Sequence, residues 1–357
     1  MDSRERVLLS LSFQQPDRIP VDFWASAGFW RGWKNLRGMT KDEFLDLHDV
    51  DFRYIAGPTY VGPRLTDSRD IWGVQRRTIE VPTGYGTETY AEVAQSLLAE
   101  AKTVEDLEAY PHWPCPDGFD YRPVAEQCRA VRDAGRIVVF MGDRLNRIAQ
   151  LKPAMYLRGV EQILMDLAMN PEIARSIFGR IRRFYNEYLE RILTAAGGAI
   201  DIVLTGDDFG SQAAPLISPS MWEQFLGEGF AGYVSRIHDA GARCMHHTCG
   251  AVTPLVGRFV DRGLDVLQSL QPEAMAEDLP DLKRQFGDRL AFQGGISIQQ
   301  TLPFGTPEQV RREVQTRAET LGPGGGYIFG TAHNVQADCP PENIDALMAA
   351  YREWGVR

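Results

Sequence analysis

The sequence predicts an α/β fold, specifically a TIM (β/α)8 barrel, from three observations. Short apolar runs rich in β-branched residues alternate with longer amphipathic segments, which is typical of βα units around a parallel sheet. Eight such runs can be counted as strands, the number that closes a barrel. The length of 357 residues, 44% of them hydrophobic, suits one barrel, so we expect a single domain over residues 1–357.

Each expected strand is followed by a helical or polar segment. In chain order the strands are residues 18–24, 51–57, 136–142, 201–206, 242–247, 265–270, 290–295 and 326–330. The clearest helix starts at Asn170, because Asn170 can cap it and Pro171 suits its first turn. Residues 70–93 depart from the alternation and indicate an inserted β-hairpin over the barrel rim, with Gly84 and Gly86 in its turn.

Charge and cysteine content exclude several classes of protein. The net charge of -10 disfavours DNA and RNA, whose partners need clustered Lys and Arg. The N-terminal MDSRERVLLSLSF lacks the apolar core of a secretory signal, and no run approaches the roughly eighteen apolar residues that cross a bilayer. Five cysteines form an odd and sparse set that suits a reducing compartment. We expect a cytoplasmic protein without a membrane or nucleic-acid partner, and the sequence leaves monomer and homodimer as alternatives.

Two clusters of metal-ligating residues follow predicted strands. The segment MHHTCGAV places His247 and Cys249 two residues apart, and FGTAHNVQADCPPEN supplies His333 and Cys339. Zinc held by three such ligands keeps a fourth position open for catalysis, whereas paired CxxC motifs, absent here, close a structural site. We predict zinc ligands His247, Cys249 and His333, with Cys339 as the alternative third ligand. The competing interpretation is a buried strand end with an inert thiol.

Other polar residues follow neighbouring strands and face the same mouth of the predicted barrel. In GDDFGSQ we expect Asp208 to point inward, as a fourth metal ligand or as a proton donor to a leaving oxygen. A helix cap or loop hydrogen bond is the alternative for either Asp207 or Asp208. His333 is the second expected catalytic residue. The side chains expected to contact substrate from these loops are Gln212, Asn334 and Gln336.

Five segments resemble the uroporphyrinogen decarboxylase superfamily, especially its corrinoid-linked methyltransferase branch. They are RERVLLSLSFQQPDRIPVDFW, GDDFGSQ, HTCG, AFQGGISIQQTLPFGTPEQVRREV and HNVQADCPPENI, and they span nearly the whole chain. The resemblance implies a TIM barrel and, in the methyltransferase branch, zinc bound by a His-x-Cys pair and by a later Cys seven residues before a proline. His247 and Cys249 match the pair. Seven residues before Pro340 this sequence has His333, a departure from the pattern of the branch.

The decarboxylases of the superfamily are the alternative that the resemblance leaves open. They carry an arginine-rich motif of the form MRQAGR after the first strand, which grips the carboxylates of the porphyrinogen. Here ASAGFWRGW offers only Arg31, a poor match to a polycarboxylate that wants several forked guanidinium donors. An aromatic rim is expected instead, with Trp24 and Trp30 stacking on a flat substrate, although aromatic residues near a first strand are as often simple core.

These features predict a zinc-dependent methyltransferase. The resemblance implies that it moves a methyl group from a small donor, such as a methoxylated aromatic, to the cobalt of a corrinoid, or from the corrinoid to an acceptor. The chain lacks a DxHxxG corrinoid-binding signature, so the corrinoid is expected on a separate protein that docks at the barrel mouth. The alternatives are a decarboxylase-like lyase of the same superfamily and a non-catalytic small-molecule-binding member.

Overall fold

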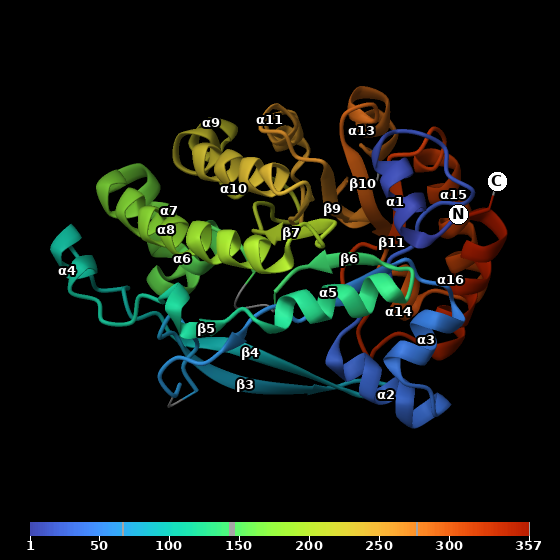
Figure 1. Ribbon diagram of the computed structural model, residues 1–357, viewed down its shortest axis with the longest axis horizontal. Coiled ribbons are helices and arrows are strands. Elements are labelled where there is room, and N and C mark those ends of the chain that lie inside the picture. Colours follow the sequence, from blue (N-terminus) through green and yellow to red (C-terminus); the bar gives the residue numbers. More distant parts are fainter. Residues whose placement is uncertain (66–67, 143–146, 276–277, 357) are drawn as a thin grey trace.

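The computed structural model describes residues 1–65, 68–142, 147–275 and 278–356. Its centre is a curved sheet of seven parallel strands, ordered β1-β6-β7-β8-β9-β10-β11 (Figure 1). The strands are β1 Phe52–Ile55, β6 Ile137–Phe140, β7 Ile202–Gly206, β8 Arg243–His247, β9 Val266–Leu270, β10 Ala291–Ile296 and β11 Tyr327–Thr331. They correspond to seven of the eight predicted strands. The prediction of an α/β fold built on a TIM-like curved parallel sheet is therefore confirmed.

The first predicted strand, residues 18–24, is not a strand in the structure. It runs beside β11, where Val21 forms an isolated parallel bridge with Phe329. On its other side the Asp51 N–H donates to the Val21 carbonyl at 3.0 Å. Pro20 has no N–H to donate, which interrupts a continuous ladder. The segment therefore spans the space between β11 and β1, the two edge strands of the curved sheet.

Asp51 fastens this closing segment to α1 (Ser3–Leu11). Its buried carboxylate pairs with Arg6 Nη1 at 2.6 Å and with Arg18 Nη1 at 2.8 Å. It also accepts a hydrogen bond from the Val21 N–H at 2.8 Å. One carboxylate thus joins the first helix, the closing segment and the start of β1.

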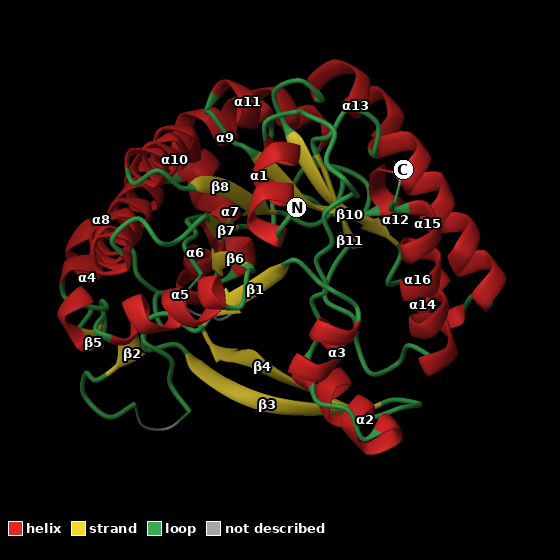
Figure 2. Cartoon of the chain, turned by 45° about the vertical axis from the view of Figure 1, so that its right-hand side comes forward, coloured by secondary structure: helices red, strands yellow, loops and turns green. Residues whose placement is uncertain are grey.

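Most helices ring the outer face of the curved sheet (Figure 2). After α1 they are α2 Ala27–Arg37, α3 Lys41–Leu47, α4 Val104–Glu108, α5 Pro123–Asp133, α6 Leu151–Arg158, α7 Val160–Met169, α8 Pro171–Ala196, α9 Pro219–Trp222, α10 Glu228–Asp239, α11 Val256–Asp261, α12 Pro272–Met275, α13 Leu279–Phe286, α14 Thr301–Phe304, α15 Pro307–Leu321 and α16 Pro341–Trp354. Among the described helices, none combines the length and apolar character that crossing a membrane requires.

The longest helix, α8, begins at Pro171 as predicted, since the fixed φ of proline suits a first helical turn. Asn170 does not cap it with its side chain, contrary to the prediction. The Asn170 Nδ2 donates instead to Asp166 Oδ1 at 3.0 Å, at the end of α7. The helix stops at Gly197, whose φ of 56° is a left-handed conformation that glycine adopts readily.

The two faces of the curved sheet bury separate apolar clusters. The inner cluster consists of Val7, Leu11, Phe52, Ile137, Val139, Ile202, Leu204, Met245, Val266, Ala291 and Ile328. Alternate residues of a strand point to opposite faces, so the strand residues of this cluster fill the inside of the curve. Two of its members come from α1, which covers the end where the strands begin (Figure 2). The opposite end, where the strands finish, is the end at which barrels of this kind carry their functional sites.

Two small antiparallel sheets lie outside the curved sheet. Strands β3 (Gln75–Pro82) and β4 (Thr87–Gln95) pair along their length, with Pro82 opposite Thr87, and residues 83–86 connect them. Strands β2 (Thr59–Tyr60) and β5 (Phe119–Asp120) form the second pair. The β3–β4 connection packs closely on α2, where a Cβ at Gly32 would lie 2.2 Å from the Tyr85 carbonyl oxygen.

Candidate functional site

The three predicted metal ligands meet where the strands end. His247 is the last residue of β8, Cys249 follows two residues later, and His333 lies two residues beyond β11. One ligand atom from each lies within 4.8 Å of the others. Cys249 Sγ is 3.4 Å from His247 Nε2. Zinc bonds of about 2.3 Å to sulfur and about 2.0 Å to nitrogen hold two tetrahedral ligands about 3.5 Å apart, so this donor set fits zinc.

Gln268 orients the His247 ring, a role that the sequence analysis missed. It lies opposite His247 on the neighbouring strand β9, and its Oε1 is 2.7 Å from His247 Nδ1. An amide oxygen only accepts hydrogen bonds, which assigns the imidazole proton to Nδ1. His247 Nε2 therefore carries a free lone pair on the side of Cys249. The polar pair Gln268 and Ser269 inside the strand VLQSL was the available signal.

Replacing Gln268 by Leu should weaken zinc binding by about tenfold to 100-fold, because His247 would lose the bond that fixes its tautomer and ring orientation. Competition against a chromophoric chelator measures the affinity. Gln293→Leu is the matched control, since that buried amide on β10 donates to Asp22 Oδ2 at 3.2 Å instead. Equal zinc affinities for Gln268→Leu and the wild-type protein would contradict the orienting role.

Ser269, which lies beside the candidate ligands, has a strained backbone conformation. Ser269 has a φ of 81°, a left-handed conformation that is costly for a residue with a side chain and that clusters at functional sites. Its hydroxyl donates to the Ala332 carbonyl, next to His333. The same oxygen lies 3.6 Å from Cys249 Sγ. Ser269 thus connects the loops that carry two of the three candidate ligands.

Burial sets the protonation of the three ligands. It lowers the pKa of His333 to about 4 and that of His247 well below its ordinary value, with nearby Arg147 adding to both effects. Both imidazoles are therefore neutral near pH 7, the form that binds metal. Burial and the neighbouring Asp208 raise the pKa of the Cys249 thiol to about 12. Without a cation this thiol stays protonated, and metal binding must displace its proton.

The adjacent aspartates have different surroundings. Asp208 lines the cavity, with its Oδ2 2.5 Å from Lys152 Nζ and its Oδ1 3.8 Å from His247 Nε2. Burial, the largest influence, would raise the pKa of Asp208, but Lys152 and the other nearby groups together hold that pKa below its usual value. Asp207 accepts hydrogen bonds from the backbone N–H groups of Gln150 and Lys152, both at 2.7 Å, at the start of α6. Burial raises the pKa of Asp207 to about 6.

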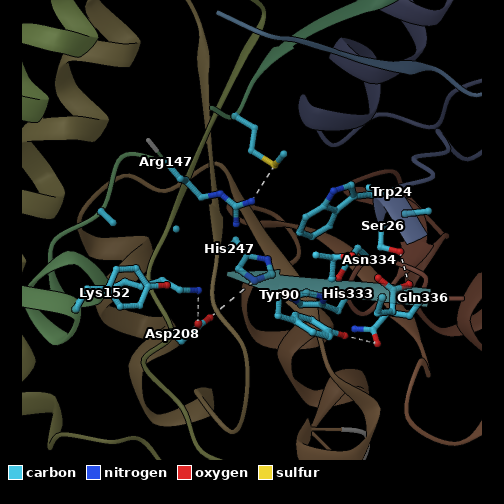
Figure 3. Close-up of a pocket in the computed structure, with 18 of the residues that line it drawn as sticks. Trp24, Ser26, Tyr90, Arg147, Lys152, Asp208, His247, His333, Asn334 and Gln336 are labelled. Atoms are coloured by element: carbon cyan, nitrogen blue, oxygen red, sulfur yellow. Dashed lines mark hydrogen bonds and ion pairs between the residues drawn. The ribbon is translucent and has the colours of Figure 1, made fainter. Parts of the chain in front are cut away.

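A cavity of about 690 Å³ opens beside the ligands (Figure 3). Its wall is strongly aromatic, with Trp24, Trp72, Tyr90, Tyr156 and Tyr185. The Trp24 ring centroid lies 5.1 Å from that of His333 and 5.7 Å from that of His247. The indole therefore borders the candidate metal ligands directly. A volume of this size accommodates a small organic molecule.

The predicted substrate contacts divide into two groups. Asn334 and Gln336 line the cavity together with Trp24, and Gln336 Oε1 accepts a hydrogen bond from the Tyr90 hydroxyl at 3.0 Å. Trp30 does not line it: the indole lies on α2 and packs on the rings of Phe23, Phe29 and Phe44. Gln212 is exposed and is bonded to Gln271, and the buried Cys339 thiol contacts Asp338 outside the three-ligand cluster.

Two basic residues on the cavity wall were also missed by the sequence analysis. Arg147 and Lys152 both follow β6, beyond a predicted strand end at which no site residue was predicted. Arg31, the arginine considered from the sequence, is exposed and donates to the Thr87 carbonyl at 3.0 Å. It is not among the residues that line the cavity.

The fold and the site define an α/β protein with a zinc-compatible ligand cluster at the strand ends of a TIM-like sheet. The uroporphyrinogen decarboxylase (URO-D) family model matches residues 81–354, and the chain belongs to this family. The prediction of the superfamily from the sequence is thereby confirmed.

The relatives align with this chain over very different lengths. A uroporphyrinogen decarboxylase from Chromohalobacter salexigens is 23% identical over 99% of this chain and 98% of its own length. One from Pseudoalteromonas translucida is 35% identical, but the match covers only 22% of each chain. Among solved structures, a methyltransferase from Methanosarcina mazei aligns with a TM-score of 0.67 and 17% identity over 99% of both chains. At this identity the structural likeness shows a shared fold.

Proposed function

We propose that this protein is a zinc-dependent methyltransferase, acting in the cytoplasm, that passes a methyl group from a small methoxylated molecule to a corrinoid carried by a separate protein. The observation that carries the proposal is the His247–Cys249–His333 cluster on the wall of an aromatic cavity. A zinc ion held by these residues would supply a Lewis acid that stabilises negative charge on the heteroatom losing its methyl group. The match to a methyltransferase fold agrees with this function.

The remaining residues of the cavity have roles that follow from their contacts. Trp24 borders both histidines and orients a flat donor against them. Asp208 is ionised beside Lys152, which disfavours the proton-donor role expected from the sequence and leaves it as an acceptor or fourth ligand. Lys152 keeps its proton, because Asp208 and Tyr156 together raise its pKa in spite of burial, which lowers it. We assign the ammonium group as the hydrogen-bond donor to the leaving oxygen.

A decarboxylase-like lyase is the second candidate, and the names of the curated relatives favour it. A substrate with several carboxylates needs several cationic groups. Among the described residues of the cavity wall these are Arg147 and Lys152, and Lys152 already pairs with Asp208. The described part of the cavity therefore suits a polycarboxylate poorly.

Methyl transfer to free cobalamin, reduced beforehand, tests the proposal. The zinc-loaded protein is incubated with methoxybenzoates, and the absorbance change from reduced to methylated cobalamin is followed. Protein-dependent methylation is the expected result. Release of carbon dioxide from a carboxylated substrate, without methylation of cobalamin, would contradict the proposal and favour the lyase.

The identity of the third ligand gives a separate prediction. His333→Ala should lose most of the bound zinc, because the site would retain only two of the three clustered ligands. Cys339→Ser should keep zinc at the wild-type level, since the Cys339 thiol is bonded to Asp338 outside the cluster. Metal analysis of both purified variants decides the question. Zinc retained in His333→Ala but lost in Cys339→Ser would reverse the assignment.

A further inference from the structure

Arg147 lines the cavity and makes few hydrogen bonds to the described residues. Its Nη2 donates to the Met141 sulfur at 3.0 Å, a weak acceptor. Its Nε is buried and has no acceptor among the residues that the structure describes. Within the described ranges, no carboxylate lies within ion-pair distance of this guanidinium. Figure 3 shows the side chain extending toward His247 and Trp24.

The protein accommodates this arginine in a confined place. Burial lowers the pKa of Arg147, although a guanidinium remains charged at any ordinary pH. Gly206, at the end of β7, leaves the room for it, since a Cβ there would lie 2.7 Å from Arg147 Cδ. The guanidinium carbon lies 5.4 Å from the Trp24 ring centroid. Trp24 therefore borders both the arginine and the candidate metal ligands.

The other charged side chains of the described cavity wall already have ion-pair or hydrogen-bond partners. Lys152 pairs with Asp208 at 2.5 Å. Glu88 accepts hydrogen bonds from the Ser26 hydroxyl at 2.6 Å and from the Ala337 N–H at 2.7 Å. Arg147 is left as the cation without a described counter-ion. A desolvated, unpaired charge is costly to a fold, and an anionic ligand would offset that cost.

Two further polar atoms on the wall lack partners among the described residues. They are the Tyr156 hydroxyl and the Asn334 Oδ1. Both residues line the same cavity as Arg147. Buried polar groups without partners are rare in folded proteins, so their clustering around one cavity points to a polar ligand.

We infer that Arg147 is a specificity-determining residue that binds a carboxylate on the substrate, so that the methyl donor is a methoxylated aromatic acid. The aromatic ring packs on Trp24, the carboxylate faces the Arg147 guanidinium, and the methoxy group faces His247 and His333. A single planar guanidinium matches one carboxylate through two parallel hydrogen bonds. The inference rests on the proposed function in one respect: the reacting methoxy group is taken to lie beside the metal ligands.

Calorimetric titration of the full-length protein tests this inference. The probes are 4-methoxybenzoate and its uncharged counterpart of the same shape, 4-methoxybenzamide, added to zinc-loaded and to zinc-free protein. Wild-type protein should bind the carboxylate at least about tenfold more tightly than the amide, since a charge-assisted bond is lost with the amide. Arg147→Met should remove this preference, chiefly by weakening the binding of the acid.

Controls separate a binding role from a structural one. Arg31→Gln removes an exposed arginine outside the cavity and should keep the wild-type preference. Arg147→Lys retains the charge but loses the fork, so its preference should fall between those of wild type and Arg147→Met. If both Arg147 variants fail to fold, the wild-type comparison of acid and amide still decides the question.

Different results would contradict carboxylate binding by Arg147 and methyl transfer by the protein. Equal affinity of wild type for acid and amide, no binding of the acid at millimolar concentration, or an unchanged preference in Arg147→Met would each overturn the inference. A carboxylate preference without methyl transfer would leave the inference standing and remove the methyltransferase. Methyl transfer from the amide as fast as from the acid would support the methyltransferase and contradict the role of Arg147.

Discussion

Cys249→Ala should lose both zinc and methyl transfer while the protein stays folded. Cys249 supplies the thiolate of the candidate site, and its sulfur lies 3.4 Å from His247 Nε2. Removal of a residue that only orients a metal ligand already costs about tenfold to 100-fold in metal affinity, so removal of a direct ligand should cost on the order of 100-fold or more. Zinc content, methylation of cobalamin and circular dichroism, measured on the same preparation, test the three parts of this prediction.

The matched control is Cys115→Ala. Cys115 is an exposed free cysteine outside the ligand cluster, and its loss should change neither zinc content nor activity. Methyl transfer at the wild-type rate by Cys249→Ala would remove the site. Zinc lost equally from both variants would instead indicate that any cysteine substitution disturbs the protein.

Asp51→Ala should have the largest effect on stability, a loss of about 3–5 kcal/mol in the free energy of unfolding. The substitution leaves Arg6 and Arg18 in a largely buried place without the carboxylate that pairs with both. It also removes the acceptor of the Val21 N–H, in the segment that spans the edges of the curved sheet. The midpoint and slope of chemical denaturation measure the change.

Asp17→Ala provides the comparison for Asp51. Asp17 pairs with the same arginine, Arg6, at 2.7 Å, but its side chain is 41% exposed. Exposed ion pairs contribute at most about 1 kcal/mol, so this variant should be only slightly less stable than wild type. Equal losses for the two variants would contradict the special place given to Asp51 in closing the sheet.

The sequence predicted the sheet well because its strands are buried on both faces. Such strands appear as apolar runs, and seven of them were found close to their observed bounds. Residues 18–24 also contain apolar residues, but Pro20 interrupts the ladder and the segment forms one isolated bridge, between Val21 and Phe329. Composition alone does not report which backbone N–H groups find a partner.

The site was predicted in part, for a related physical reason. His247, Cys249 and His333 follow strands, and parallel strands bring their carboxyl ends together, so the sequence located this cluster. The sequence did not distinguish Trp24, which lines the cavity, from Trp30, which does not. Trp30 lies on α2, where the helix turns its ring toward Phe23 and Phe44, while Trp24 precedes the helix and borders the cavity.

Gln268 and Arg147 were missed because their roles depend on contacts between elements. Gln268 matters through the register of β9 beside β8, which places its amide opposite His247. Arg147 is notable for the acceptors that its guanidinium lacks in the described structure, and a sequence carries no record of a missing partner. Both roles emerge only when the neighbouring strands and loops are in place.

The zinc content of the purified protein, in wild type and in His247→Ala, shows whether the metal site exists. We expect about one zinc per wild-type chain, lost in His247→Ala, because His247 Nε2 is held toward Cys249 by the bond from Nδ1 to Gln268. Absence of metal from folded, zinc-supplemented wild-type protein, or equal zinc in the two proteins, would contradict the metal site on which the proposed methyltransferase depends.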